Sequence, residues 1–212
     1  VARPPSTMVA TPSPMAPDAR ALEAIAGKLL AAEHPMLLAE YAGRRPGGFE
    51  AIVELAETVG AAVWDINNAL NFPNKHPLCL SMDKGSLKHA DLVVGLDVRD
   101  WEKQLTELNN ALRTRENLTP PHCDFVEIGF GEINISKWSF DYCRMQPCSV
   151  RALGDTALGI PELTRLCKAR IAGDAALQKR IAERKVTIGR RHDEVWSQWQ
   201  REARENWDTS PL

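Results

Sequence analysis

Two patterns of apolar residues alternate along this chain. Short, mostly apolar runs, each typical of a strand buried on both faces, occur at residues 36–39, 61–64, 91–96, 125–128 and 148–150. Between them, apolar residues recur every three or four positions at residues 18–30, 49–59, 101–113 and 155–167, which predicts amphipathic helices. Asp18 and Asp155 are suited to begin two of these helices as N-caps, and Gly60 is suited to end another.

This alternation predicts a doubly wound α/β domain of Rossmann-like type. We expect a parallel sheet of five to six strands, joined by right-handed crossovers, with helices on both faces of the sheet. Residues 67–83 follow neither pattern and contain several Asn and Pro residues, so they predict a loop. The predicted domain spans residues 18–173.

The two ends of the chain differ from this domain. Residues 1–17 contain five prolines among Ser, Thr and Ala, which predicts an extended linker. Residues 174–212 are rich in charge and sparse in apolar residues, which predicts a helical arm. Trp196, Trp199 and Trp207 lie in this arm. Such aromatic residues either anchor an interface or fold back onto the domain's own core, and the sequence leaves both interpretations open.

Composition narrows the class of protein. Of 212 residues, 44% are hydrophobic and 25% are charged, as in ordinary globular proteins, and the formal net charge is −2. We therefore expect neither nucleic acid nor an anionic membrane surface as a partner, and no apolar run reaches the roughly 18 residues that span a bilayer. The five cysteines form no Cys-x-x-Cys pair, which argues against a disulfide framework or a zinc site and indicates a reducing, cytoplasmic compartment.

Candidate chemistry is sparse. No zinc-protease, nucleophile-elbow or P-loop motif occurs, so we predict neither catalytic nor metal-binding residues. The glycine-rich loop after the first strand lacks the dinucleotide fingerprint. The carboxyl ends of parallel strands still form a crevice, and Gly43, Arg44, Asn67 and Arg99 are its candidate nucleotide-binding residues. The alternative is that these arginines are solvated or paired with neighbouring aspartates.

Six segments, taken in order, resemble a known family. They are ALEAIAGKLLAAEHPMLLAE (residues 21–40), FEAIVELAETVGAAVWD (49–65), FPNKHPL (72–78), HADLVVG (89–95), FVEIGFGEINISKW (125–138) and LGDTALGIPEL (153–163). Together they are similar to the central domain of thiamine-diphosphate-dependent enzymes of the acetolactate synthase and benzoylformate decarboxylase type. The resemblance covers about residues 18–170.

The resemblance implies that the parent is a 2-oxo acid carboligase or decarboxylase that binds thiamine diphosphate and Mg²⁺. In the family, a preceding pyrimidine-binding domain supplies the catalytic glutamate. A following diphosphate-binding domain carries a GDG…N magnesium motif, which Gly154-Asp155-Thr156 does not complete. We therefore expect the chain, which starts at Val1, to be excised from a longer homo-oligomeric enzyme and to do no chemistry by itself.

Some relatives bind FAD or an adenine nucleotide on the central domain. Arg99 matches the family's arginine after the third strand, but Gly129 stands where the family has an acidic residue after the fourth. A carboxylate there would suit a ribose or an adenine, so its loss predicts that the nucleotide site is empty. The alternative function is a free-standing module that binds FAD, ADP or NAD through the crevice.

Overall fold

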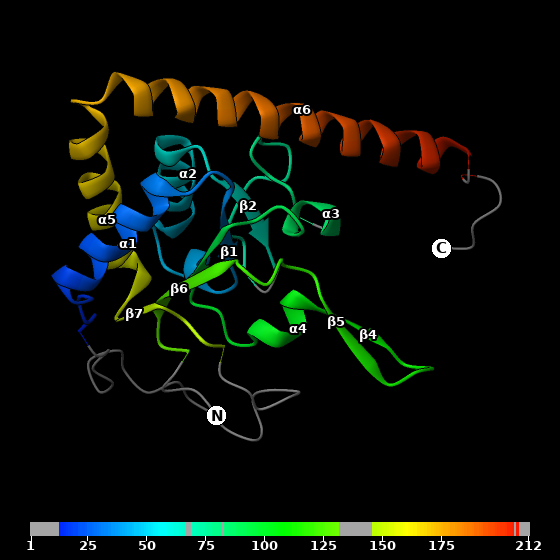
Figure 1. The fold of residues 1–212 in the computed structure, drawn as a ribbon, viewed down its shortest axis with the longest axis horizontal. Helices are drawn as coiled ribbons and strands as arrows, with labels where there is room; N and C mark the ends of the chain where they lie inside the picture. Colours follow the sequence, from blue (N-terminus) through cyan, green and yellow to red (C-terminus); the bar gives the residue numbers. More distant parts are fainter. Residues whose placement is uncertain (1–12, 67–68, 82, 132–145, 206, 208–212) are drawn as a thin grey trace, which may run out of the picture.

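A five-stranded parallel sheet forms the centre of the molecule in the computed structural model, which describes residues 13–66, 69–81, 83–131, 146–205 and 207. Its strands are β1 (Pro35–Ala39), β2 (Ala62–Asp65), β3 (Leu92–Leu96), β6 (Asp124–Gly129) and β7 (Val150–Leu153). They lie in the order β2-β1-β3-β6-β7, and every neighbouring pair is parallel (Figure 1). The predicted Rossmann-like sheet is confirmed, and its strand order reverses between β1 and β3.

Three long helices cover one face of the sheet. They are α1 (Ala19–Ala31), α2 (Gly48–Val59) and α5 (Thr156–Ile171), and their buried apolar residues form one core with alternate residues of the strands. The predicted helix ends are confirmed: Asp18 accepts a hydrogen bond from the amide of Ala21, Asp155 accepts one from Ala157, and Gly60 ends α2 with a φ of 62°. Local capping chemistry therefore set these boundaries.

Two short helices cover the other face. They are α3 (Lys84–Leu87) and α4 (Trp101–Leu105). The indole of Trp101 lies directly on β3 at Gly95, where an added Cβ atom would be 2.1 Å from the ring. A second core cluster forms here from Met36, Leu38 and the residues around Trp101.

The predicted helix at residues 101–113 is wrong beyond residue 105. A hairpin of β4 (Thr106–Asn109) and β5 (Thr114–Asn117) follows α4 and projects from the domain (Figure 1). Leu108 and Leu112, which supported the helix, are 42% and 71% exposed, so their spacing does not mark a buried stripe. The Asn109 side chain accepts a hydrogen bond from the amide of Leu112, and this local turn replaces the helical hydrogen bonds.

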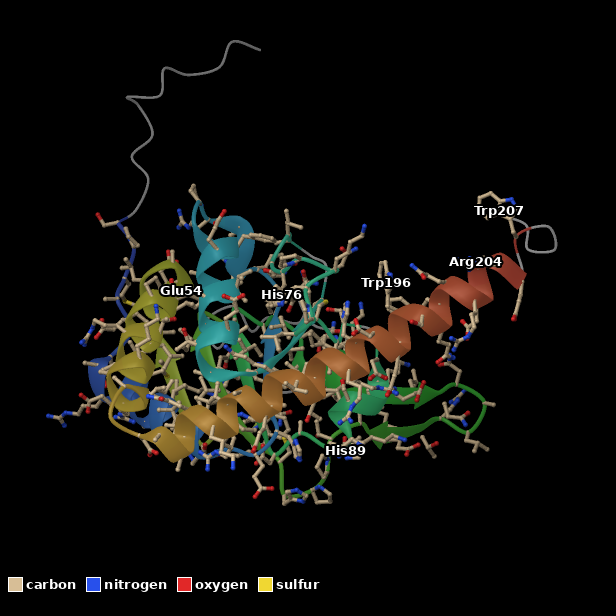
Figure 2. The ribbon with its side chains drawn as sticks, turned by 90° about the horizontal axis from the view of Figure 1, so that it is seen from above. Glu54, His76, His89, Trp196, Arg204 and Trp207 are labelled. Carbon is tan, nitrogen blue, oxygen red and sulfur yellow. The ribbon has the colours of Figure 1, made fainter. Side chains whose placement is uncertain are left out.

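The arm is the helix α6 (Ala175–Glu205), which crosses the domain beside the ends of α1 and α2 (Figures 1 and 2). Leu177 and Ile181 join the main core. Arg180 donates a hydrogen bond to the carbonyl of Leu30, and Arg184 donates to the carbonyls of Ala32 and Val59. These carbonyls are among those that a helix end leaves without intrahelical donors, so two arginines of the arm cap two helices of the domain.

The described part of the proline-rich linker contacts the domain. Residues 13–17 have no regular secondary structure, but Pro17 is buried beside Gly154 and Gly159, and the carbonyl of Met15 accepts a hydrogen bond from Asp155. Residues 1–12 lie outside the described residues. Within the described chain, no helix is both long and apolar enough to cross a bilayer.

Candidate functional site

The carboxyl ends of β1 and β3, where the strand order reverses, are the place at which the sequence predicts the crevice. Doubly wound sheets bind ligands at this position. Buried carboxylates follow the strands here: Glu40 after β1, Asp65 at the end of β2, Asp97 after β3 and Asp155 after β7. A buried carboxylate needs hydrogen-bond donors, so the donors decide what remains for a ligand.

Asp97 binds three donors from different elements. Arg44 of the short helix η2 (Ala42–Arg44) donates to Asp97 Oδ2 over 2.6 Å, and the Thr156 hydroxyl donates to the same oxygen over 2.9 Å. The amide of Phe130 donates to Oδ1 over 3.4 Å. Asp97 itself has a φ of 52°, a left-handed conformation that places its side chain among these donors. The Asp97 carboxylate therefore accepts from the same kinds of donor, a guanidinium, a hydroxyl and an amide, that would otherwise bind a phosphate.

Gly129 makes room for Asp97. Gly129 has a φ of 152°, and an added Cβ atom would be 2.8 Å from Asp97 Oδ1 and 2.9 Å from its Cα. A carboxylate side chain at residue 129 would therefore collide with Asp97 and repel its charge. The glycine that departs from the family pattern fits the present crevice because Asp97 fills the adjoining space.

Gly43 is required by the neighbouring loop. An added Cβ atom at Gly43 would be 2.0 Å from the carbonyl oxygen of Leu70. The Gly43 amide donates to the side chain of Asn71, whose own amide donates to Glu40 O and Asp65 Oδ1. The loop around Leu70 thus fills the space next to Gly43, and the side chain of Asn71 accepts the Gly43 N–H group, which a phosphate would need.

Arg99 is the candidate cation that stays open to solvent. Its backbone amide donates to Glu40 Oε2 over 2.5 Å, and its guanidinium lies 5.9 Å from the centre of the Tyr41 ring. In the described structure this guanidinium forms no ion pair. One exposed cation beside an aromatic face is a weak anion site, because solvent screens its charge.

The structure brings together three of the four predicted crevice residues. Arg44 is paired with Asp97, Gly43 contacts the loop, and Arg99 faces solvent; Asn67 lies outside the described residues. Arg45 pairs with Asp155 over 3.4 Å. The pairing with aspartates that the sequence left open is therefore present for Arg44, and it removes most of the predicted phosphate donors.

Asn71 is the residue that sequence reasoning missed. It is fully buried and joins the ends of β1 and β2 through its side chain. The sequence offered only a turn signal there. Its role depends on strand ends that are far apart along the chain.

Metal-binding and thiol chemistry find little support in the described residues. No group of three or more His, Cys, Asp or Glu side chains among them could hold a metal ion. Cys79, Cys123 and Cys167 are free thiols, and Cys143 lies outside the described residues. Burial raises the pKa of Cys123 and of Cys167 to about 12, so both stay protonated at neutral pH.

The tryptophans of the arm, which the sequence predicted either to anchor an interface or to fold back onto the domain, differ in their burial. Trp196 stacks on the buried His192 with ring centres 6.1 Å apart, and His192 bonds to the carbonyl of Cys79 over 2.7 Å. Trp199 is 38% exposed and lies beside Trp196, with ring centres 6.2 Å apart, whereas Trp207 is 82% exposed near the end of the arm (Figure 2). The arm therefore packs on the domain through Trp196, with Trp199 partly exposed beside it and Trp207 exposed to solvent.

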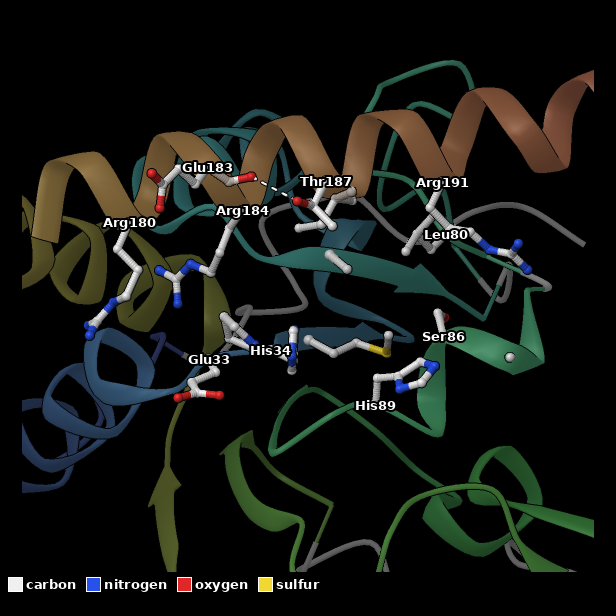
Figure 3. Close-up of a pocket in the computed structure, with 15 residues that line it drawn as sticks. Glu33, His34, Leu80, Ser86, His89, Arg180, Glu183, Arg184, Thr187 and Arg191 are labelled. Atoms are coloured by element: carbon white, nitrogen blue, oxygen red, sulfur yellow. Dashed lines mark hydrogen bonds between the residues drawn. The ribbon is translucent and has the colours of Figure 1, made fainter.

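A separate cavity lies at the opposite ends of the strands, between α6 and α3. We call it the α6–α3 hollow; its volume is about 570 Å³. In Figure 3, Arg180, Arg184 and Thr187 extend from α6 on one side, His34 lies before β1, and Ser86 and His89 of the α3 region face them. The walls also contain Met36, Leu80 and Ile188.

The fold is similar to solved thiamin diphosphate-dependent enzymes. One from Mycobacterium smegmatis is 23% identical, with a TM-score of 0.55 over 74% of this chain and 29% of its own. Benzoylformate decarboxylase from Polynucleobacter necessarius is 17% identical, with a TM-score of 0.53 over 78% of this chain and 30% of its own. For the 4-hydroxybenzoylformate decarboxylase of Rhodococcus jostii these values are 15%, 0.56, 78% and 31%.

The chain thus spans only about 30% of the length of these neighbours. No protein-family model matches the sequence, and no curated protein matches it. Identities of this size establish the fold alone. The resemblance that the ordered motifs predicted is therefore confirmed at the level of the fold, and the chain has a fold that thiamin diphosphate-dependent enzymes contain.

Proposed function

We propose that this chain is the central domain of a thiamine-diphosphate-dependent enzyme, a 2-oxo acid carboligase or decarboxylase, and that it serves there as a structural spacer. The observation that carries the proposal is the fold shared with three such enzymes over about 30% of their length. The ordered motifs support it, because residues 21–40, 49–65 and 153–163 each contain at least part of a helix and of a strand of the domain, and residues 89–95 and 125–129 reach β3 and β6.

The state of the crevice favours a structural role over a catalytic one. Asp155, which begins the incomplete GDG-like sequence, accepts the amide of Ala157 and pairs with Arg45, so it serves as a helix cap. Thiamine diphosphate and Mg²⁺ would accordingly bind to the parent's other two domains. The expected division is a linker at residues 1–17, the domain at 18–173 and a connecting arm at 174–212, within a cytoplasmic homo-oligomer.

Calorimetry tests this proposal directly. Titration of the chain with thiamine diphosphate and Mg²⁺ is expected to give no saturable heat at millimolar cofactor. Stoichiometric binding to this chain would refute the spacer role. The reading frame is the second test: it is expected to encode a glutamate-bearing domain before residue 1 and a GDG…N motif after residue 212, and a frame without them would contradict the assignment.

Nucleotide binding is the second candidate function, and the exposed Arg99 beside Tyr41 is the observation that favours it. Arg44 and Gly43 do not support it, because their donors already bind Asp97 and Asn71. Thermal unfolding with millimolar FAD, ADP or NAD separates the two functions. A stabilisation that Arg99→Gln abolishes would establish the crevice as a nucleotide site, whereas an unchanged melting temperature would leave only the spacer role.

A further inference from the structure

The α6–α3 hollow differs from the crevice in place and in chemistry. It lies at the amino ends of β1 and β2, lined by Pro35 and Met36 of one strand and Ala62 of the next. Its volume of about 570 Å³ falls within the roughly 300–1,000 Å³ of small-molecule sites. It therefore has room for a ligand without any rearrangement of the crevice.

Apolar side chains form the inner walls of the hollow. Met36 and Leu80 are buried members of the second core cluster, and Ile188 of α6 packs against it. The face of the sheet is open here because α3 has only four residues and covers little of it. An apolar group that entered the hollow would displace water from these walls, which is favourable.

One end of the hollow carries positive charge that the described residues leave without a carboxylate partner. Arg180 and Arg184 lie one turn apart on α6, and in the described structure both bond to helix carbonyls rather than to acidic groups. Arg184 is buried, its Nε has no hydrogen-bond partner there, and burial lowers its pKa to about 10, which still leaves it charged at neutral pH. The carboxyl ends of α1 and α2 supply only partial negative charge.

The acidic residues nearby neutralise this end only in part, because the charge of Asp91 raises the pKa of Arg184 by less than burial and the charge of Arg180 lower it. The Asp91 carboxylate accepts the amides of Glu33 and His34 over 2.7 and 2.9 Å. Glu33 and Glu183 are exposed at the rim, where solvent screens their charge. A buried cation that no carboxylate contacts directly is unfavourable, so an anion that pairs with this end would be stabilised.

We propose that the α6–α3 hollow binds a small organic carboxylate with an apolar body. The carboxylate meets the exposed guanidinium of Arg180 at the mouth, in the field of the buried Arg184. The apolar body lies against Met36, Leu80 and Ile188. The site belongs to this chain's own residues and is independent of the proposed role as a spacer.

Calorimetry and amide NMR on the chain test this proposal with matched probes. Octanoate supplies the anion with an aliphatic body and 3-phenylpropionate the anion with an aromatic one; octylammonium reverses the charge, and acetate lacks the body. One of the first two is expected to bind with one-to-one stoichiometry, about tenfold to a hundredfold more tightly than octylammonium or acetate, as expected for a hydrogen bond to a charged group. The tighter of these two probes identifies whether the apolar body of the ligand is aliphatic or aromatic.

Three variants locate the binding. Ile188→Trp fills the hollow and is expected to abolish binding, while the exposed Arg180→Gln keeps the shape and weakens binding about tenfold. Val186→Trp, on the exposed outer face of the same helix, is the control and is expected to bind the carboxylate as tightly as the unsubstituted chain does. Equal binding of octanoate and octylammonium, no binding of either carboxylate, or equal losses in Ile188→Trp and Val186→Trp would each overturn the proposal. Arg180→Gln keeps the test valid if the tryptophan variant fails to fold.

Discussion

Arg184 docks α6 onto the domain through two hydrogen bonds, and their loss allows a prediction of the change in the free energy of unfolding. Arg184 Nη1 donates to the carbonyl of Ala32 over 2.6 Å, and Nη2 donates to the carbonyl of Val59. The change Arg184→Met keeps most of the apolar stem and removes both donors. Two carbonyls at the ends of α1 and α2 then lose their partners, at a cost of about 1–3 kcal/mol each.

Two gains offset part of this loss. The variant no longer buries a charge, and it no longer buries an Nε–H without an acceptor. We therefore expect the free energy of unfolding to fall by about 2–4 kcal/mol. In a chain of this size, that change lowers the melting temperature by about 5–15 °C.

Urea denaturation followed by circular dichroism measures the change. The midpoint should fall while the slope stays constant, because the variant loses stability without changing the surface exposed on unfolding. Arg190→Met makes the same substitution at an exposed position of α6 and should change stability by no more than about 0.5 kcal/mol. If Arg184→Met costs no more than this control, the two arginine–carbonyl bonds do not stabilise the docked arm.

Three further predictions concern the core, a cap and the thiols. Gly95→Ala should destabilise the fold by at least about 1–3 kcal/mol in urea, because its Cβ would meet the Trp101 ring at 2.1 Å; a stability equal to that of the parent chain would disprove this packing. Asp155→Ala should cost about 0.5–2 kcal/mol by the same assay, whereas Asp155→Asn should recover most of it, and equal losses in both would contradict the capping role. Mass spectrometry after iodoacetamide treatment at pH 8 should find Cys123, whose pKa burial raises to about 12, alkylated much more slowly in the folded chain than in the chain unfolded by urea. Since folding favours the neutral thiol of Cys123, its contribution to stability is complete below pH about 9 and is lost as the pH rises toward 12; equal alkylation rates would contradict this burial.

The crevice shows how a sequence pattern can locate candidate residues without deciding which partners their donors bind. Arg44 and Gly43 follow the first strand, as phosphate-binding residues do, and both lie at the switch point of the sheet. The tertiary structure assigns their donors to Asp97 and Asn71 instead. The sequence left the pairing of Arg44 with an aspartate open and could not decide it, because the partners are separated from the crevice loop by 28 and 53 positions.

Local interactions explain what the sequence determined by itself. The first four strands, the helices on the first face and their ends at Asp18, Gly60 and Asp155 depend on periodicity and capping, which act within a few residues, whereas the strand predicted at 148–150 begins only at Val150 and continues to Leu153. The parallel sheet follows from their alternation. The ordered motifs likewise predicted a fold that solved thiamin diphosphate-dependent enzymes share.

Only the tertiary structure decided the features that depend on distant partners. The hairpin after Leu105 replaces a helix because its leucines find no core to bury against. The arm is held by Arg180 and Arg184 because two helix ends, far apart in the sequence, present their carbonyls to one face of α6. The same crossing of α6, beside the amino ends of β1 and β2, forms one wall of the α6–α3 hollow, since a cavity exists only where separate elements leave space between them.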